Sequence, residues 1–274
     1  MSKINLIINN KKAGYIAGLM AEQFMASVLP LAQKKLPPGW DWVNSSNHAV
    51  VAKNTGDQNS QQVFFKMFLH RSLGEGIKAF LKGSRCHRSI QQSDVLLKHG
   101  FNAPEVYCWG RCLSYDFMIT QAIVSIGYGD YIKNYSKLVE KQNKPKNIAE
   151  IVSSKRLLVS SLGSLIGRLH QTGIIHGDLR PNNILVQTDY PIPEFYFIDN
   201  ERNKFYKCPP RKLIIKNLVQ IMMFFPKDLS FTYRQRFYKN YFSTVGRFNL
   251  NEQKKITLAV HEKVKKRLKG RSCE

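Results

Sequence analysis

Three polar residues lie at a spacing that could perform phosphoryl transfer. Asp178 precedes Asn183 by five positions, and Asp199 follows the next apolar run. A carboxylate such as Asp178 can accept or orient the proton of an attacking hydroxyl. The amide of Asn183 and the carboxylate of Asp199 can hold metal ions that neutralise nucleotide phosphates. This spacing is typical of a kinase catalytic loop followed by its metal-binding strand.

The residues around these three support the same interpretation. Arg180 lies two positions after Asp178, where its fixed charge could contact the transferring phosphoryl group. Pro181 fixes a backbone φ angle and so stiffens the loop. The apolar runs at 184–186 and 195–198 predict two short buried strands. A polar turn that merely caps a helix would not explain these two strands.

These segments resemble a known family. Residues 176–186 and 197–202 are similar to the bacterial lipopolysaccharide kinases, which include Kdo kinases and core-heptose kinases and are distant relatives of protein kinases. The segment 213–220 resembles the helix after the metal site in that family, and 234–241 resembles its R-x-R-F-x-x-x-Y segment. Residues 84–104 resemble an upstream helix of the family with its glycine stop and proline. The resemblance covers most of the chain.

The resemblance implies both a fold and an activity. The fold is α+β and protein-kinase-like, with a small antiparallel-sheet N-lobe and a mainly helical C-lobe. The activity is transfer of a phosphoryl group from ATP, with Mg²⁺, to a sugar hydroxyl of Kdo or heptose in the lipid A–core of lipopolysaccharide. Asp178 would be the base and Arg180 a further catalytic residue. Asn183 and Asp199 would bind the metal and the nucleotide, and Lys66 would contact the nucleotide phosphates.

We expect three parts along the chain. Residues 1–37 form a helical extension, residues 38–121 the N-lobe, and residues 122–274 the C-lobe with a basic C-terminal helix. The extension holds a helix over about 18–34, and a buried helix over about 151–171 leads to the catalytic loop. Alternating and apolar segments predict five N-lobe strands, at 40–43, 48–53, 61–68, 105–109 and 114–120.

The N-lobe departs from the kinase pattern around Lys66. This lysine lies mid-strand among apolar residues, which is the position of the lysine that contacts the α- and β-phosphates. The turn at 44–47 lacks the glycines that let backbone N–H groups approach phosphate, although Asn and Ser could substitute for them. The helix over 84–99 also has no glutamate to pair with Lys66. The alternatives for that partner are Asp94, Gln91, Gln92 and, in the preceding linker, Glu75.

The residues around the catalytic loop favour a small or glycolipid acceptor over a protein. Gly177 stands where protein kinases controlled by phosphorylation usually carry an arginine, so such a switch would have no anchor. The segment from Asp199 to Pro210 is short and leaves little room for a peptide platform. Arg202 and Lys204 could hold a phosphate or carboxylate of the substrate, although surface ion pairing would explain them equally well.

Composition limits the partners and the cellular location that we expect for the protein. The 274 residues carry a net charge of +23, which suits an anionic membrane face, phosphorylated glycolipid or nucleic acid. No aromatic and basic recognition motif accompanies the charge, so we expect no nucleic acid partner. The five cysteines are scattered and favour reduced thiols in the cytoplasm over a zinc site. With no signal peptide visible, we expect a cytoplasmic protein that is peripheral on the inner membrane.

The C-terminal helix over 254–271 is basic and amphipathic. Its apolar residues lie four apart, and eight Lys and Arg residues surround them. Two interpretations remain open: the helix binds anionic lipid, or it packs on the C-lobe and leaves its outer face in solvent.

Three rival functions remain open beside a lipopolysaccharide kinase. A kinase for another small molecule would share every catalytic residue. A protein kinase would need a peptide platform. A pseudokinase or binding module would bind nucleotide weakly and turn nothing over.

Overall fold

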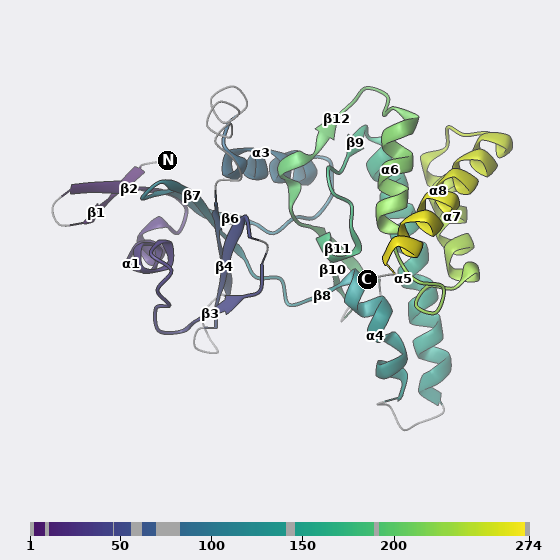
Figure 1. The fold of residues 1–274 in the computed structure, drawn as a ribbon, viewed down its shortest axis with the longest axis horizontal. Helices are drawn as coiled ribbons and strands as arrows, with labels where there is room; N and C mark the ends of the chain where they lie inside the picture. Colours follow the sequence, from purple (N-terminus) through teal and green to yellow (C-terminus); the bar gives the residue numbers. More distant parts are fainter. Residues whose placement is uncertain are drawn as a thin grey trace. The chain divides into compact units, whose positions relative to one another are not determined.

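The computed structural model describes residues 3–8, 11–45, 47–55, 62–69, 83–140, 146–188 and 192–271. The chain forms two compact units (Figure 1). Unit 1 comprises Met1–Asp94 and Ala103–Ile123, and unit 2 comprises Val95–Asn102 and Val124–Glu274.

Unit 1 is built on a seven-stranded antiparallel sheet. Its strand order is β1-β2-β6-β7-β5-β4-β3. The strands are β1 (Lys3–Ile8), β2 (Lys11–Gly18), β3 (Trp40–Val43), β4 (Ala49–Asn54), β5 (Val63–Phe68), β6 (Val106–Cys112) and β7 (Tyr115–Gln121). The five strands predicted for the N-lobe are therefore confirmed as β3 to β7.

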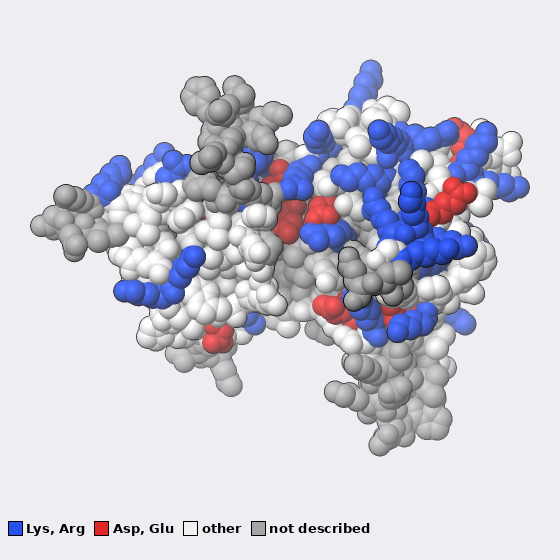
Figure 2. Space-filling model, in the orientation of Figure 1, with Lys and Arg blue, Asp and Glu red and all other residues white. Residues whose placement is uncertain are grey.

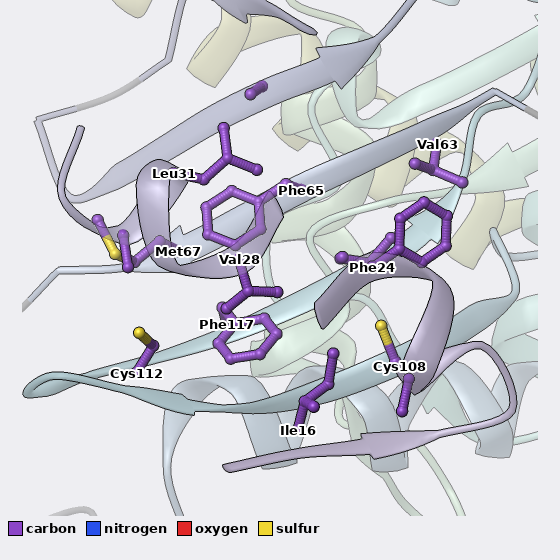
Figure 3. Packing of buried hydrophobic residues seen from close by; sticks show 14 of the residues in the cluster. Ile16, Phe24, Val28, Leu31, Val63, Phe65, Met67, Cys108, Cys112 and Phe117 are labelled. Atoms are coloured by element: carbon purple, nitrogen blue, oxygen red, sulfur yellow. The ribbon is translucent and has the colours of Figure 1, made fainter. Parts of the chain in front are cut away.

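Helix α1 (Ala21–Ala32) covers one face of this sheet and closes the core of unit 1. Alternate residues of β5, such as Phe65, point to that face and are buried, as the strand period of two requires. Val28 and Leu31 of α1 meet them, and the rings of Phe65 and Phe117 stack at 5.7 Å (Figure 3). Burial of each such side chain contributes about 1.5–3 kcal/mol.

The helical extension predicted for residues 1–37 differs from the structure over its first half. Lys3–Ile8 and Lys11–Gly18 are strands, and β2 joins the sheet through β6. Only Ala21–Ala32 is helical, and it packs on the same sheet. The cause is an alternation of apolar and polar residues that places Leu6 and Ile16 in the core. This segment therefore completes the sheet of unit 1.

Unit 2 is mainly helical, as predicted for the C-lobe. Its helices are α4 (Tyr128–Glu140), α5 (Lys146–Gln171), α6 (Arg211–Ile221), α7 (Phe231–Val245) and α8 (Leu250–Arg271), while α3 (Arg85–Lys98) runs from unit 1 into unit 2. One small sheet has the order β11-β10-β8, with β8 at Ile126–Gly127, β10 at Ile184–Gln187 and β11 at Glu194–Phe197. A second pairs β9 (Ile174–Ile175) with β12 (Lys204–Phe205).

Helices α5 and α7 pack closely because two glycines face α7. A Cβ atom at Gly163 would lie 2.5 Å from the carbonyl oxygen of Phe237, and one at Gly167 would lie 2.8 Å from that of Tyr241. The buried helix predicted before the catalytic loop is thus confirmed, together with the packing role of its glycines. Leu157 is the exception among its predicted apolar positions, because it is 43% exposed.

The C-terminal helix α8 uses its apolar face within unit 2. Ile256, Val260 and Val264 are buried, and α8 packs against α6. Its lysines and arginines from Lys254 to Lys269 stay exposed, and Figure 2 shows basic side chains gathered over α6 and α8. Packing on the C-lobe is therefore confirmed, so lipid contact by this helix would have to use its outer charges.

None of the helices in the described ranges is both long enough and apolar enough to cross a bilayer.

Candidate active site

Two short sheets hold the loop that contains Asp178. The loop begins after β9, which pairs with β12, and ends in a 3-10 turn at Pro181–Asn183 that leads into β10. Strands β10 and β11 pair antiparallel, which confirms the two strands predicted around the turn between them. The backbone N–H of Ile198 donates to the carbonyl oxygen of Asn183 at 3.0 Å. This bond brings Asp199, two residues after the end of β11, close to the end of the loop.

Both carboxylate oxygens of Asp178 have partners within unit 2. Oδ1 accepts a hydrogen bond from Nε2 of Gln220 at 3.0 Å, and Oδ2 forms an ion pair with Arg180 at 2.6 Å. The side chain is 23% exposed, so a substrate can still reach it. The carboxylate is thus held in one orientation and is open to solvent, as a base that meets an external hydroxyl requires.

The side chain of Asn183 is buried and fixed by the same loop. Its Nδ2 donates to the backbone oxygen of Asp178 at 2.8 Å, which leaves Oδ1 as the acceptor end of the amide. Asp199 supplies a carboxylate beside it. Oxygen atoms of these two kinds suit Mg²⁺, so the residues present fit that ion. In the described part of the chain, no group of three or more His, Cys, Asp or Glu could hold a metal. Phosphate oxygens and water would complete the coordination.

The backbone of Asp199 adopts a left-handed conformation, with φ 59° and ψ 44°. Residues other than glycine rarely adopt this region, and such strain concentrates at functional sites. The 3-10 turn Asn200–Arg202 follows directly. The strained residue is therefore one that the sequence assigns to metal binding.

His176 ties the loop to the segment after Asp199. Its Nδ1 accepts from the backbone N–H of Asp178 at 3.1 Å, so Nε2 carries the proton and donates to Oδ1 of Asn200 at 3.2 Å. Complete burial lowers the pKa of His176 to about 4, which keeps the ring neutral. Asn200 in turn donates to the carbonyl oxygen of Phe197 at 3.0 Å. His176 therefore has a positioning role.

Helix α6 holds Asp178 through two residues that the sequence interpretation missed. Oε1 of Gln220 accepts from the backbone N–H of Leu179 at 3.3 Å and from Nδ2 of Asn217 at 3.2 Å. Asn217 also donates to the carbonyl oxygen of His176 at 2.7 Å. These contacts orient the Gln220 amide so that its N–H points to Asp178. The available signal was two polar residues three apart on the apolar face of a helix.

The network continues into the core of unit 2. Nε2 of His170 donates to Oδ1 of Asn217 at 3.2 Å, and Nδ1 of His170 accepts from the hydroxyl of Tyr241 at 2.9 Å. Burial lowers the pKa of His170 to about 4, so this ring is also neutral. A chain of uncharged groups therefore links Tyr241 on α7 to the carboxylate of Asp178, through Asn217 and Gln220 on α6.

Gly177 is required by close packing within the loop. A Cβ atom there would lie 2.1 Å from Cβ of Arg202 and 2.4 Å from its carbonyl oxygen. An arginine at 177 would not fit this backbone. Lys216 on α6 donates to the carbonyl oxygen of Gly177 at 3.4 Å. Arg180, Arg202 and Lys216 thus place exposed positive charge around Asp178.

Lys66 lies in unit 1. It is half-buried on β5, and its Nζ lies 5.4 Å from the ring centre of Phe68. Its assignment to the nucleotide phosphates stays a prediction. Of its proposed partners, Asp94 and Gln91 are exposed on α3 and Gln92 is half-buried there, whereas Glu75 lies outside the described residues.

Comparisons with known proteins agree with this geometry. The model of the lipopolysaccharide kinase (Kdo/WaaP) family matches residues 128–241. WaaP in complex with acyl carrier protein superimposes with a TM-score of 0.55 at 17% identity, over 82% of this chain and 88% of that one. The WbdD crystal structure gives 0.45 at 18% identity, over 82% and 45%. No curated protein sequence matches this chain. The predicted resemblance to the lipopolysaccharide kinases is thereby confirmed over residues 128–241, and the kinase-like fold and the enzyme class, a kinase, are confirmed with it.

Proposed function

Because residues 128–241 match the lipopolysaccharide kinases, we propose that this protein transfers the γ-phosphoryl group of ATP to a hydroxyl of Kdo or heptose in the lipid A–core. The observation that carries the proposal is the fixed carboxylate of Asp178. Gln220 and Arg180 hold its two oxygens, and Asn183 binds its backbone. A pseudokinase would not need a carboxylate oriented in this way.

The residues of the site divide the chemistry between them. Asp178 accepts the proton of the attacking hydroxyl, and Gln220 keeps it oriented toward the acceptor. Arg180 offsets negative charge as the phosphoryl group moves. Asn183 and Asp199 would hold Mg²⁺, which neutralises the nucleotide phosphates when it is bound. Lys66 would contact those phosphates from unit 1.

The charge around Asp178 suits an anionic acceptor. Arg180 and Arg202 expose more than half of their side chains, at 61% and 57%. Both lie at the catalytic loop, so an acceptor that carries phosphate or carboxylate groups would be attracted to it. Kdo is a sugar acid, and core sugars that carry phosphate are also anionic. This supports a glycolipid acceptor, although any anionic small molecule would share the attraction.

The basic outer face of α8 supports contact with an anionic membrane. Lys255, Lys263 and Lys266 are exposed there, while the apolar residues of the helix face α6. Each such charge contributes about 1 kcal/mol near an anionic leaflet. We infer peripheral binding on the cytoplasmic face of the inner membrane, where the acceptor would be presented.

The test is transfer of labelled phosphate. Purified protein is incubated with γ-labelled ATP, magnesium and a lipid A–core acceptor, beside Asp178→Asn and the control Asp41→Asn, which changes an exposed acid on β3. We expect label on the glycolipid with wild type and the control, and none with Asp178→Asn. Transfer to a different acceptor would show that the protein is a kinase with another substrate. Nucleotide binding without transfer to any acceptor would support a pseudokinase.

A further inference from the structure

A polar cavity lies between α5 and α7, apart from the loop that contains Asp178. Its volume is about 600 Å³, and its lining residues are Ser160, Thr232, Gln235, Arg236, Lys239 and Asn240. Ser160 lies ten positions before His170 on α5, which corresponds to about 15 Å along the helix. The Ser160 end of the cavity is therefore distant from the hydrogen-bond network behind Asp178, whereas Asn240 lies next to Tyr241 of that network.

The lining has the chemistry of an anion site. Two of the lining residues, Arg236 and Lys239, are cations, and none is acidic. The others carry hydroxyl or amide groups, which can donate to and accept from sugar hydroxyls. Ser160 donates to the carbonyl oxygen of Arg156, which leaves its oxygen available as an acceptor. Asn240 donates to the carbonyl oxygen of Arg236, so its side-chain amide oxygen is also available as an acceptor.

The two arginines of the R-x-R-F-x-x-x-Y segment have different roles. Arg234 donates to the carbonyl oxygens of Leu229, Met222 and Phe224 at 2.7–3.0 Å, so it is a structural residue that ties α7 to the end of α6. The Nε of Arg236 is buried and has no hydrogen-bond partner among the described residues. Buried N–H groups are rarely left without an acceptor, so such a group calls for a functional explanation.

We propose that this cavity binds a phosphorylated sugar. Its phosphate would lie between Arg236 and Lys239, where the guanidinium can bind two phosphate oxygens and turn its Nε–H toward an acceptor. Sugar hydroxyls would meet Ser160, Thr232 and Gln235. Small-molecule sites occupy about 300–1,000 Å³, so the volume suits a sugar phosphate better than a single phosphate ion. The ligand could be a soluble sugar phosphate or the phosphorylated sugar of a glycolipid.

Calorimetric titration of the full chain tests the site. The ligands are glucose 6-phosphate, glucose, inorganic phosphate and vesicles that contain lipid A. The site variant is Arg236→Gln with Lys239→Gln, and the control is Lys35→Gln with Lys98→Gln, which removes equal charge from exposed positions after α1 and on α3. We expect saturable binding of glucose 6-phosphate or of the vesicles, weakened at least 10-fold in the site variant and less than 2-fold in the control.

The ligand that binds shows whether the cavity takes a soluble sugar phosphate or the phosphorylated sugar of a glycolipid. Binding of glucose 6-phosphate indicates a soluble sugar phosphate, and binding of lipid A vesicles alone indicates the glycolipid. Arg236 should also be protected from phenylglyoxal by the bound ligand, which detects the site even if a variant is unstable. Equal binding by the site variant, or no binding of either ligand by wild type, would overturn the proposal. The same titration with Asp178→Asn separates this site from the kinase reaction, because binding should persist there.

Discussion

Replacement of Gln220 tests whether α6 sets the orientation of the Asp178 carboxylate, the proposed base. Gln220→Leu keeps the approximate size of the side chain but removes the N–H that Asp178 accepts at 3.0 Å. It also removes the acceptor for the backbone N–H of Leu179. Gln220→Glu keeps that acceptor and places a second carboxylate against Asp178. The two variants therefore separate support of the loop from orientation of the base.

The magnitude follows from the contact and its exposure. A hydrogen bond to a charged group contributes about 1.5–3 kcal/mol, and the 23% exposure of Asp178 favours the lower end because water replaces part of the loss. Since 1.36 kcal/mol corresponds to tenfold in rate, we expect kcat to fall about 10-fold in Gln220→Leu. The fall should be larger in Gln220→Glu, because two like charges would repel. KM for ATP should stay unchanged in both.

Steady-state phosphate transfer measures these effects, and urea unfolding accompanies it. The control is Gln253→Leu on α8. It removes a comparable hydrogen bond, in which the side-chain amide of Gln253 donates to the carbonyl oxygen of Phe248 at 2.8 Å. Its kcat should match wild type. Folded Gln220→Leu and Gln220→Glu proteins with wild-type kcat would show that Asp178 needs no support from α6, and the reasoning would fail.

Three further predictions concern stability. Gly177→Ala should cost about 1–3 kcal/mol in urea unfolding, and lower kcat, because its methyl group meets Arg202; an unchanged unfolding midpoint would contradict this. Burial lowers the pKa of His170 and of His176 from 6.5 to about 4, so the unfolded chain binds more protons between these values. Stability should be full above pH 6.5 and fall by on the order of 3 kcal/mol per histidine toward pH 4, and a flat profile by calorimetry would refute it. Arg234→Gln should destabilise the protein by about 2–4 kcal/mol, because a guanidinium that binds three carbonyl oxygens is lost. An unchanged melting temperature would contradict this prediction.

The candidate catalytic loop could be predicted because its chemistry is local in sequence. Asp178 and Asn183 lie within one loop, and Asp199 lies two residues after β11, the second strand after that loop, so spacing alone relates them. Gln220 lies 42 positions after Asp178, and only the packing of α6 brings the two side chains together. Tyr241 belongs to a segment that the resemblance marks, yet its bond to His170 depends on how α5 meets α7. Sequence patterns do not show which side chains on different helices come into contact.

In the fold, too, elements with a local sequence pattern could be predicted, whereas contacts between distant segments could not. Short apolar strands with polar turns predict β3 to β7 correctly, since their period of two is visible in the sequence. The first two strands were missed although Ile4 and Leu6 flank a polar residue, because the asparagines and lysines at 9–12 resemble a polar tail in the sequence. The pairing of β2 with β6 joins residues about 90 positions apart, and β1 enters the sheet only through β2. The burial of the α8 apolar face likewise depends on α6.

The left-handed backbone of Asp199 has a consequence for how this protein can change. Glycine adopts φ near 59° without penalty, whereas an L-residue there loses about 1 kcal/mol. Asp199→Gly would relieve this strain, but the freedom of glycine in the unfolded chain would offset most of the gain, so stability should stay close to wild type while the carboxylate proposed to bind metal is lost. A laboratory screen for heat resistance alone would therefore accept glycine at this position and discard turnover. The aspartate persists only where selection acts on the product of the reaction.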